Sequence, residues 1–378
     1  MEKIYKESLE FHKKLKGKLE VKSKTKLENK KDLSLAYTPG VAQVSREIGK
    51  NKKLAYAYTL KQNTVAIVSD GSAILGLGNL GAEAAIPVME GKAILFKEFA
   101  GVDAFPICLD TQDSEEIIRI VKALAPVFGG INLEDISAPR CFEIETKLKK
   151  ELSIPVMHDD QWGTATVVLA ALINALKLKK QTAQKVKVVI NGAGAAGLAV
   201  AKLLLEYGFK NIILCDSEGI IHKARKNLNN QKKKLLKLTN KSGMKGLLAD
   251  AVKGADVFVG VSKPGLLTPE MVRSMNKRCA IMALANPIPE IMPDEAKKAG
   301  AFIVATGRSD FPNQINNVLA FPGIFRGALD NRVKQITHKM LINAAVKLAS
   351  LAKPLTPEQI LPNPFNKKIA KEIAKTIK

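Results

Sequence analysis

Two pairs of adjacent carboxylates stand out in a strongly basic chain. Glu134-Asp135 and Asp159-Asp160 each follow a short apolar run that predicts a buried strand, the second of them at Ile154–Met157. The carboxyl ends of strands are where α/β sheets place their ligands, and three hard oxygen ligands suit Mg²⁺ or Mn²⁺. A structural interpretation stays open beside this one, in which Asp160 caps the following helix and Glu134-Asp135 is a polar loop.

A glycine-rich turn at residues 192–197 predicts a dinucleotide-binding site. This GxGxxG motif follows the predicted strand Val186–Ile190 and opens the predicted helix Gly197–Tyr207, which is the context that the motif requires. Its first glycine permits the tight turn, the second lets the backbone approach the pyrophosphate, and the third allows close packing of helix on strand. The phosphates would lie at the helix N-terminus, where free N–H groups favour anions. We therefore predict cofactor contacts at Gly192, Gly194, Ala195, Ala196 and Gly197.

Asp216 ends the next predicted strand, Ile212–Asp216, about 20 residues after the glycines. Its carboxylate is placed to accept hydrogen bonds from the adenosine ribose hydroxyls, and a 2′-phosphate would meet it unfavourably. Glu218 adds a second negative charge nearby. The sequence therefore favours NAD as the cofactor, with NADP kept as the alternative.

A second GxGxxG match, Gly76–Gly81, lacks this context. The predicted strand before it ends several residues earlier, at Ser69, and no strand with a terminal acidic residue follows at the right distance. We interpret this segment as a tight structural turn beside the active site, not as a second cofactor site.

The length and the charge of the chain limit the classes of protein that it can be. At 378 residues it exceeds one ordinary domain. Its formal net charge of +23 fits either a surface that binds nucleic acid or another polyanion, or a solvated surface rich in lysine. The lysines are spread along the whole chain and aromatic residues make up only 5%, so no basic run interleaves with stacking side chains. We favour the solvated surface and expect no nucleic-acid partner.

The cysteines and the apolar segments predict a cytoplasmic protein. Cys108, Cys141, Cys215 and Cys279 are scattered without CxxC spacing, which argues against a disulfide framework or a thiolate zinc site. The N-terminus lacks the continuous apolar segment of a signal peptide, and the apolar run Thr166–Ala175 is too short for a bilayer span. We therefore expect no membrane association.

Strand and helix patterns alternate in two series, which indicates an α/β fold with parallel or mixed sheets. We predict an N-terminal substrate and catalytic domain over residues 1–160, a Rossmann-like, doubly wound dinucleotide-binding domain over 161–330 and a helical, lysine-rich tail over 331–378. The predicted strands are Thr64–Val68, Ala104–Leu109, Ile154–Met157, Val186–Ile190, Ile212–Asp216, Val257–Val261, Ala280–Ala283 and Phe302–Ala305. The predicted helices nearest the site are Ala82–Phe99, Ser114–Ala125 with Ser114 as its N-cap, Asp160–Leu178 and Gly197–Tyr207.

An ordered series of motifs runs from about residue 35 to residue 330. Its segments are Tyr37–Ala42, Ser69–Gly81, Gly91-Lys92, Glu134–Ile136, His158–Ala165, Gly192–Gly197, Ala285–Pro287, Ala305–Ser309, Asn316–Val318 and Phe321–Gly323. Together, in this order and spacing, they resemble the malic enzymes, specifically the short bacterial type. The resemblance implies an NAD(P)-dependent, oxaloacetate-decarboxylating malate dehydrogenase that converts (S)-malate to pyruvate and CO₂. It also implies a divalent metal ion, Mg²⁺ or Mn²⁺, and a homodimer.

The resemblance further implies roles for individual side chains. The catalytic residues of the family correspond to Tyr37, Lys92 and Asp159, and its metal ligands to Glu134, Asp135 and Asp160. Its substrate-binding asparagines correspond to Asn286, which also contacts the cofactor, and Asn317. With these matches, the acidic pairs are predicted to hold a metal ion.

The chemistry of the family explains why these residue types are needed. The C2 hydroxyl group of malate must lose a proton as hydride leaves C2 for the nicotinamide, and Lys92 is the expected base. That role requires the pKa of Lys92 to be lowered by nearby positive charge or by burial. The metal ion would polarise the C2 oxygen. Tyr37 is the expected acid that protonates C3 after the C4 carboxylate has left as CO₂.

One position departs from the longer malic enzymes, which carry an arginine for a substrate carboxylate where this chain has Ala73. Arg140 and Arg308 are the candidates to replace that arginine. Two other functions stay open: a related reaction on the same fold, malolactic conversion or oxaloacetate decarboxylation, and a polyanion-binding protein that has kept an old enzyme fold.

Overall fold

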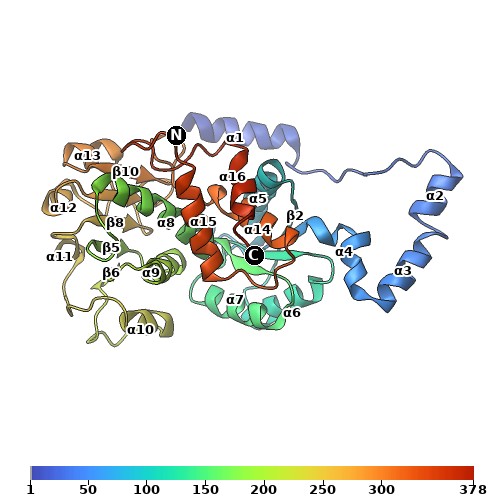
Figure 1. The fold of residues 1–378 in the computed structure, drawn as a ribbon, viewed down its shortest axis with the longest axis horizontal. Helices are drawn as coiled ribbons and strands as arrows, with labels where there is room; N and C mark the ends of the chain where they lie inside the picture. The colour runs from blue at the N-terminus through green and yellow to red at the C-terminus, as the bar shows by residue number, and fades with distance from the viewer. Residues whose placement is uncertain (1) are drawn as a thin grey trace.

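The computed structural model describes residues 2–378 and contains two sheets surrounded by helices (Figure 1). The first sheet has four parallel strands in the order β2-β1-β3-β4, namely β1 Thr64–Ser69, β2 Asp103–Cys108, β3 Gly130–Leu133 and β4 Val156–His158. Because parallel strands end at the same edge of a sheet, the residues that follow β1, β3 and β4 are gathered there. The predicted α/β fold is confirmed.

The helices of the first half cover different strands of the first sheet. Helix α5 (Ala82–Ala100) packs on β1 and β2, while α6 (Ser114–Leu124) packs on α7 (Arg140–Glu151), which reaches β4. The prediction that Ser114 caps α6 is wrong by one residue. Asp113 is the N-cap, because its Oδ1 accepts the backbone N–H of Glu116 at 2.7 Å.

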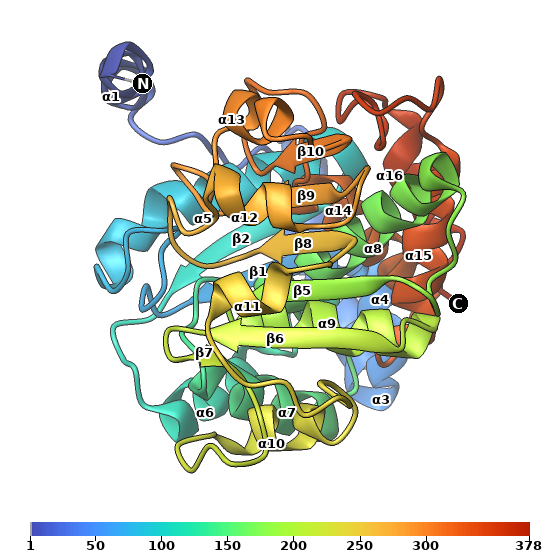
Figure 2. The ribbon, with the colours of Figure 1, turned by 90° about the vertical axis from the view of Figure 1, so that its left-hand side faces the viewer.

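The second sheet has the strand order of a Rossmann fold. Its strands are β5 Lys187–Asn191, β6 Asn211–Asp216, β7 Gly219–Ile220, β8 Val257–Gly260, β9 Ala280–Ala283 and β10 Ile303–Thr306. They lie in the order β10-β9-β8-β5-β6-β7, with β7 as a two-residue antiparallel edge. Figure 2 shows helices on both faces of this sheet, with α11 (Leu248–Val252) and α12 (Pro269–Ser274) in front and α9 (Ala195–Tyr207) behind. The predicted doubly wound fold is therefore confirmed.

Helix α8 (Asp159–Lys179) links the two sheets. It begins directly after β4 and packs on α9 beside the second sheet. By length and composition it is apolar enough to cross a bilayer, but most of it is buried inside the protein. Every residue from Ala165 to Leu176 is buried, so this stretch has no solvent-facing side, which is typical of a core helix.

The C-terminal helices return to the first sheet. Helix α14 (Phe321–Asp330) packs on α5 and β3, and its rings of Phe321 and Phe325 lie edge-on to Phe96, with centroids 4.8 and 5.4 Å away. Helix α15 (His338–Ser350) packs on α8, and α16 (Lys368–Ala374) on α14. The tail thus shares its core with both halves, and the predicted domain limits stay a prediction. The remaining short elements are η1 Lys52–Leu54, η2 Leu60–Asn63, α10 Asn230–Leu236, α13 Pro293–Lys298 and η3 Asn317–Leu319.

The residues before β1 form an arm. It contains α1 (Glu2–Leu15), α2 (Lys30–Ala36), α3 (Val41–Lys50) and α4 (Ala55–Tyr58), and Figure 1 shows α2 and α3 well away from both sheets. The arm exposes large apolar side chains at Leu33, Leu35, Tyr37, Tyr58 and Leu60. Clustered exposed apolar side chains of this kind mark a surface that contacts another molecule.

Candidate active site

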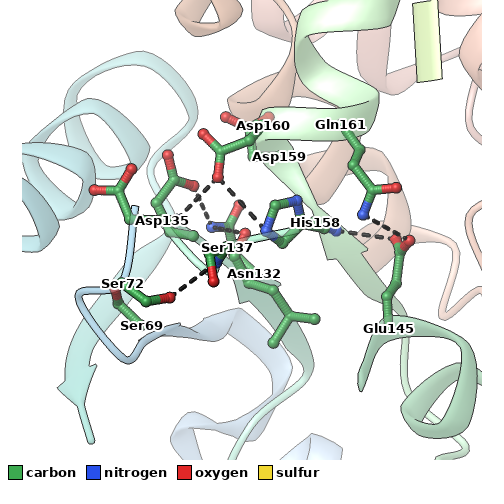
Figure 3. A network of polar contacts seen from close by, with 12 residues as sticks. Ser69, Ser72, Asn132, Asp135, Ser137, Glu145, His158, Asp159, Asp160 and Gln161 are labelled. Carbon is green, nitrogen blue, oxygen red and sulfur yellow. Dashed lines mark hydrogen bonds and ion pairs between the residues drawn. The ribbon is translucent and has the colours of Figure 1, made fainter. Parts of the chain in front are cut away.

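Three carboxylates meet where β3 and β4 end. Glu134 and Asp135 follow β3, and Asp160 lies in the first turn of α8, directly after the neighbouring strand β4. One oxygen atom from each of the three lies within 4.8 Å of the other two, and Figure 3 shows Asp135 beside Asp160. The local backbone brings them together: Asp135 has a left-handed φ of 53°, and its N–H donates to Asp160 Oδ2 at 2.8 Å.

The position of Asp160 also decides between the two sequence interpretations. His158 is the N-cap residue of α8, so Asp160 does not cap the helix. Glu134 and Asp135 are only 5% and 4% exposed, so they do not form a solvated polar loop. The geometry is that of a ligand cluster.

This cluster holds more negative charge than its surroundings neutralise. Burial, followed by the charges of Asp160 and Glu134, raises the pKa of Asp135 to about 9. Burial likewise raises the pKa of Glu134. Within the described residues, the buried Oδ2 of Asp135 has no hydrogen-bond partner. Crowded hard oxygens with one left unpaired fit a divalent cation such as Mg²⁺ or Mn²⁺.

Lys92 reaches this cluster from α5. Its side chain is buried, and its Nζ donates to Glu134 Oε1 at 2.7 Å and to Asp159 Oδ2. The ammonium also lies 4.1 Å from the centre of the Phe321 ring. Burial alone would lower the pKa of Lys92, but the charges of Asp159 and Glu134 outweigh it and raise that pKa above its usual range. The sequence analysis expected a lowered pKa for Lys92. That expectation is wrong for the protein without a metal ion, because the two carboxylates hold the proton on the amine.

Asp159 connects Lys92 to the second half of the chain. It is fully buried, and burial raises its pKa to about 7 although the charge of Lys92 opposes that shift. Asn317 in η3 donates from Nδ2 to Asp159 Oδ2 at 2.5 Å. A Cβ on Gly163 would lie 1.8 Å from Asp159 Oδ1, so only glycine fits one turn further along α8. The structure thus brings together the predicted residues Lys92, Asp159 and Asn317.

The second glycine motif forms a tight turn beside these carboxylates. The N–H of Leu77 donates to the carbonyl of Ile74 at 2.9 Å, and that of Leu75 to Asp135 Oδ1 at 3.4 Å. A Cβ on Gly76 would lie 2.0 Å from the carbonyl oxygen of Asn286, which follows β9. The turn therefore places the exposed Asn286 of the second half against the edge of the first sheet.

The first glycine motif forms the turn between β5 and α9. Gly192 has a φ of 115°, and its N–H donates to the carbonyl of Cys215 in β6 at 2.9 Å. A Cβ on Gly197 would lie 1.7 Å from the carbonyl oxygen of Gly192, so the third glycine allows the close packing that the motif predicts. Helix α9 begins at Ala195, two residues before the predicted start, so Ala195 and Ala196 form its first turn.

Tyr37 is the predicted site residue that the chain does not bring to the cluster. It is the C-cap of α2 on the arm and is 67% exposed. Figure 1 shows α2 far from the first sheet, where Lys92 and the three carboxylates lie. The fold of one chain therefore separates the two expected acid–base residues.

Comparisons with known proteins match both halves of the chain. The family model "Malic enzyme, N-terminal domain" matches residues 16–119 and 111–149, and "Malic enzyme, NAD binding domain" matches residues 162–378. This chain belongs to the malic enzyme family. The predicted resemblance, fold and class of enzyme are thereby confirmed.

Three relatives show how wide the family is around this malic enzyme. The "Bifunctional malic/malolactic enzyme" of Bacillus subtilis is 56% identical over 374 residues, which cover 98% of this chain and 91% of that protein. An "NADP-dependent malic enzyme" of Rhizobium meliloti is 51% identical over 94% of this chain, which spans 47% of that longer protein. The solved NAD-dependent malic enzyme from Thermotoga maritima has a TM-score of 0.95 at 50% identity, with 98% of each chain covered.

The Asp216 carboxylate of this malic enzyme is engaged by two cations that the sequence analysis missed. Arg225 Nη1 and Lys232 Nζ each donate to it at 2.6 Å. Burial opposes its ionisation, but the hydrogen bonds from Arg225 and Lys232 outweigh that effect and lower its pKa. Nothing in the local spacing predicts these contacts, because Arg225 and Lys232 lie in an irregular segment and a short helix.

Glu145 is a second residue that the sequence analysis missed. It is buried on α7 and accepts hydrogen bonds from the His158 backbone N–H at 3.0 Å and from Gln161 Nε2 at 3.3 Å (Figure 3). It also accepts one from Trp162 Nε1 at 3.0 Å. It also pairs with Lys149 at 2.7 Å. These bonds hold the junction between β4 and α8, from which the carboxylate of Asp160 projects. The sequence analysis gave no element for residues 140–151, and a glutamate among the apolar residues of that segment was the available signal.

The two arginines suggested as replacements at Ala73 both contact protein groups. Arg140 Nη2 pairs with Asp70 Oδ2 at 2.8 Å and donates to Ser72 Oγ at 2.9 Å. Arg308 donates to Asp310 at 2.8 and 2.6 Å and to the Pro287 carbonyl at 3.1 Å. Neither arrangement gives a reason to assign the substrate carboxylate to these residues.

Two cavities lie away from the carboxylate cluster. One of about 450 Å³ lies between α7 and residues 229–231, and one of about 250 Å³ lies among α7, α8, α9 and α10. The second is lined by Trp162, Leu198 and Lys202 among others. Neither of these two cavities is lined by a predicted catalytic residue.

Proposed function

We propose that this enzyme oxidises and decarboxylates (S)-malate to pyruvate and CO₂ while it reduces a nicotinamide dinucleotide. The observation that carries this proposal is the buried contact of Lys92 with Glu134 and Asp159, beside the oxygens of Asp135 and Asp160. It supports a proton-transfer role for Lys92 beside three carboxylates that would hold a divalent cation, at the sheet edge near Asn317. Both are needed to oxidise a 2-hydroxy acid and then remove its carboxylate.

The residues of the cluster have distinct roles in this mechanism. Glu134, Asp135 and Asp160 would hold the metal ion, which supplies polarisation of the C2 oxygen. Lys92 takes the proton of the C2 hydroxyl group, and Asp159, hydrogen-bonded to Lys92, can accept it in turn. When Glu134 serves as a metal ligand, its hold on the Lys92 ammonium weakens, because one carboxylate charge is then shared. Asn317 keeps the Asp159 carboxylate oriented towards Lys92.

The test is a spectrophotometric assay of purified protein with Mn²⁺, malate and either dinucleotide. We expect an increase in absorbance of the reduced nicotinamide and one pyruvate for each dinucleotide reduced. No reduction with either dinucleotide, in protein that is folded and binds Mn²⁺, would refute the proposed reaction.

We also propose that the enzyme works as a homodimer in which Tyr37 acts in the site of the partner subunit. Tyr37 is exposed on an arm that extends away from its own Lys92, and the arm also exposes Leu33, Leu35 and Tyr58. A second copy that covers these apolar side chains would bring Tyr37 to the cluster, where it can protonate C3. The same arm would then form the dimer contact and contribute Tyr37 to the active site of the partner subunit.

A mixture of two inactive variants tests this arrangement. Tyr37→Phe and Lys92→Ala should each lose turnover, but a mixed dimer would contain one site with neither substitution if Tyr37 acts in trans. After unfolding and refolding together, we expect about a quarter of wild-type activity from random pairing. If the mixture stays inactive while sedimentation shows mixed dimers, Tyr37 acts within its own chain.

The preferred dinucleotide is proposed to be NAD, with NADP also accepted. Asp216 lies at the end of β6 beside the Gly192 turn, where a Rossmann carboxylate binds the adenosine ribose. Replacing Asp216 with alanine should weaken NAD more than NADP. A steady-state comparison of the two dinucleotides in wild type and variant measures this directly, and an unchanged preference would contradict the ribose role.

A malolactic reaction is the second candidate, because the Bacillus subtilis relative is named a bifunctional malic/malolactic enzyme. In that case lactate would form and no reduced dinucleotide would be released. Chromatography of the products separates the two, since pyruvate with reduced dinucleotide supports oxidative decarboxylation and lactate supports the alternative.

We propose that the enzyme acts in the cytoplasm on a small-molecule substrate, without nucleic-acid or membrane partners. Supporting this, the cysteines at 108, 141, 215 and 279 are free thiols, which fits a reducing compartment. Fractionation of cells that express a tagged chain would locate it, and recovery with membranes would contradict the proposal.

A further inference from the structure

The carboxylate of Asp216, at the end of β6, is held by the side chains of Arg225 and Lys232, a pair of cations called the fork below. Arg225 donates from Nη1 to Asp216 Oδ1 at 2.6 Å and from Nη2 to Oδ2 at 3.2 Å. Lys232 Nζ donates to Oδ2 at 2.6 Å. The three side chains are 9 to 18% exposed, so the contacts are formed at the edge of the core and not in bulk water. Such short, charge-assisted contacts are of the strong kind.

The charges around this carboxylate balance. Glu218 lies 3.4 Å from the Arg225 guanidinium, so two carboxylates face two cations. Asn227 accepts from Arg225 at 3.3 Å through Oδ1 and donates to Glu218. An isolated Asp216 would repel a phosphate, but this group of four charged side chains has a net charge of zero. The repulsion that the sequence alone predicts is therefore largely removed.

The fork lies where a dinucleotide would place its adenosine ribose. The Gly192 N–H bonds the carbonyl of Cys215, so the glycine turn and the end of β6 are adjacent. Lys232 is on α10, whose N-cap Asn229 accepts its backbone N–H at 2.9 Å and whose Leu235 is buried. Lys232 thus lies on anchored backbone, and Arg225 and Lys232 both lie where the ribose 2′ position is expected. A planar guanidinium beside an ammonium matches the geometry of a phosphate group.

We propose that Arg225 and Lys232 are the side chains that receive the 2′-phosphate of NADP, and that the Asp216 carboxylate competes with this phosphate for them. With NAD, Asp216 keeps both cations and accepts hydrogen bonds from the ribose. With NADP, the phosphate takes over contacts that Asp216 now makes. Asp216 therefore determines how strongly NAD is preferred over NADP, and it does not exclude NADP. The inference rests on the proposed use of a dinucleotide.

Binding measurements without malate or metal ion test this proposal separately from turnover. Isothermal titration gives the dissociation constants of NAD and NADP for the wild type, for Asp216→Ser and for the double variant Arg225→Gln/Lys232→Gln. In Asp216→Ser both cations are released, so the ratio of NADP to NAD affinity should rise by about 100-fold. In the double variant, NADP affinity should fall by about tenfold more than NAD affinity.

The matched control is the double variant Lys226→Gln/Lys233→Gln. Lys226 and Lys233 are exposed neighbours in sequence, and their replacement removes the same charge without touching Asp216. A pair of fragments isolates the phosphate: 2′,5′-ADP should bind no more tightly than 5′-AMP to the wild type, but more tightly than 5′-AMP to Asp216→Ser. Thermal melts establish that each variant is folded.

Each outcome separates the possibilities. If the control lowers NADP affinity as much as the Arg225/Lys232 variant, the general field of the basic surface is responsible and the proposal is wrong. If 2′,5′-ADP binds no better than 5′-AMP to any form, Arg225 and Lys232 are only a structural pair for Asp216. If folded protein binds neither dinucleotide, the proposed function fails together with this inference, whereas NAD binding without the predicted ratios overturns this inference alone.

Discussion

Asp135 and Asp216 both lie at the carboxyl edge of a parallel sheet, one after β3 and the other at the end of β6. Their surroundings are opposite. Asp135 is buried against Glu134 and Asp160, and its pKa is raised to about 9. Asp216 is buried against Arg225 and Lys232, and its pKa is lowered. The same residue type at the carboxyl edge of two sheets thus has opposite electrostatic surroundings, which suit the two different ligands proposed above.

The difference shows what each site leaves for its ligand to supply. At the first sheet the protein collects negative charge without neutralising it, so a divalent cation relieves repulsion when it binds. At the second sheet the protein supplies the cations itself, so an anionic ligand must compete with a carboxylate already in place. Five predictions test this contrast, from the largest expected effect to the smallest.

Replacing Lys92, whose ammonium group contacts the first site, should have the largest effect. In Lys92→Ala, we expect kcat to fall by about 10³-fold, the usual scale for loss of an acid–base group. The dissociation constant of NAD should stay nearly unchanged, because the glycine turn lies at the other sheet. Lys97→Ala is the control, since Lys97 is on the same helix but pairs with Asp103 at the surface. If NAD binding and turnover fail together, Lys92 is structural.

Removing one negative charge from the first site should weaken metal binding and raise the thermal stability of the metal-free protein. Asp135→Asn should lower Mn²⁺ affinity by about 100-fold, as expected on losing one of three charged ligands. The metal-free variant should melt about 2–4 °C higher than metal-free wild type, because a crowded charge is gone. Titration calorimetry and thermal melts in chelator measure both effects.

The pH dependence of the metal-free protein checks the same point. A carboxyl group whose pKa is raised by folding binds its proton more tightly in the folded state, so its stabilising effect is lost as pH rises towards that pKa. Metal-free wild type should therefore lose stability between about pH 4 and about pH 9, and Asp135→Asn should lose less. Parallel curves for the two proteins would show that Asp135 is not the strained group.

The hydrogen bonds of Glu145 should matter only at the first site. Glu145→Gln leaves the junction of β4 and α8 less firmly held, so Mn²⁺ affinity should fall by about tenfold, the effect typical of residues behind metal ligands. NAD affinity should not follow. Glu143→Gln is the matched control, because Glu143 is an exposed residue of the same helix that pairs with Lys147. Equal losses in both variants would point to a general effect of charge on α7.

The smallest expected effect is on folding stability at Asp216. Its sign is opposite to the stability change expected at Asp135. Asp216→Asn leaves Arg225 and Lys232 without their carboxylate, so the free energy of unfolding should decrease by about 1 kcal/mol after allowance for partial solvation. Urea unfolding at neutral pH measures it. An increase in stability would mean that Asp216, like Asp135, is held in an unfavourable environment, and the contrast between the two sites would disappear.

The sequence by itself determined where the strands end and which residues follow them. Alternation of strand and helix patterns placed Glu134, Asp160 and Asp216 at carboxyl edges, and the spacing of Gly192, Gly194 and Gly197 predicted the turn that the structure contains. These features depend on neighbouring residues, because backbone conformation and side-chain periodicity are local properties. The ordered motifs then identified the family.

Only the tertiary structure decided the electrostatics and the partnerships. Asp159 and Glu134 lie 67 and 42 residues from Lys92, and their contact with it reversed the expected direction of its pKa. The cations at Asp216, the support of Glu145 and the remote position of Tyr37 likewise follow from how distant segments pack. Charge interactions depend on distance in space and on burial, and neither is a property of spacing along the chain.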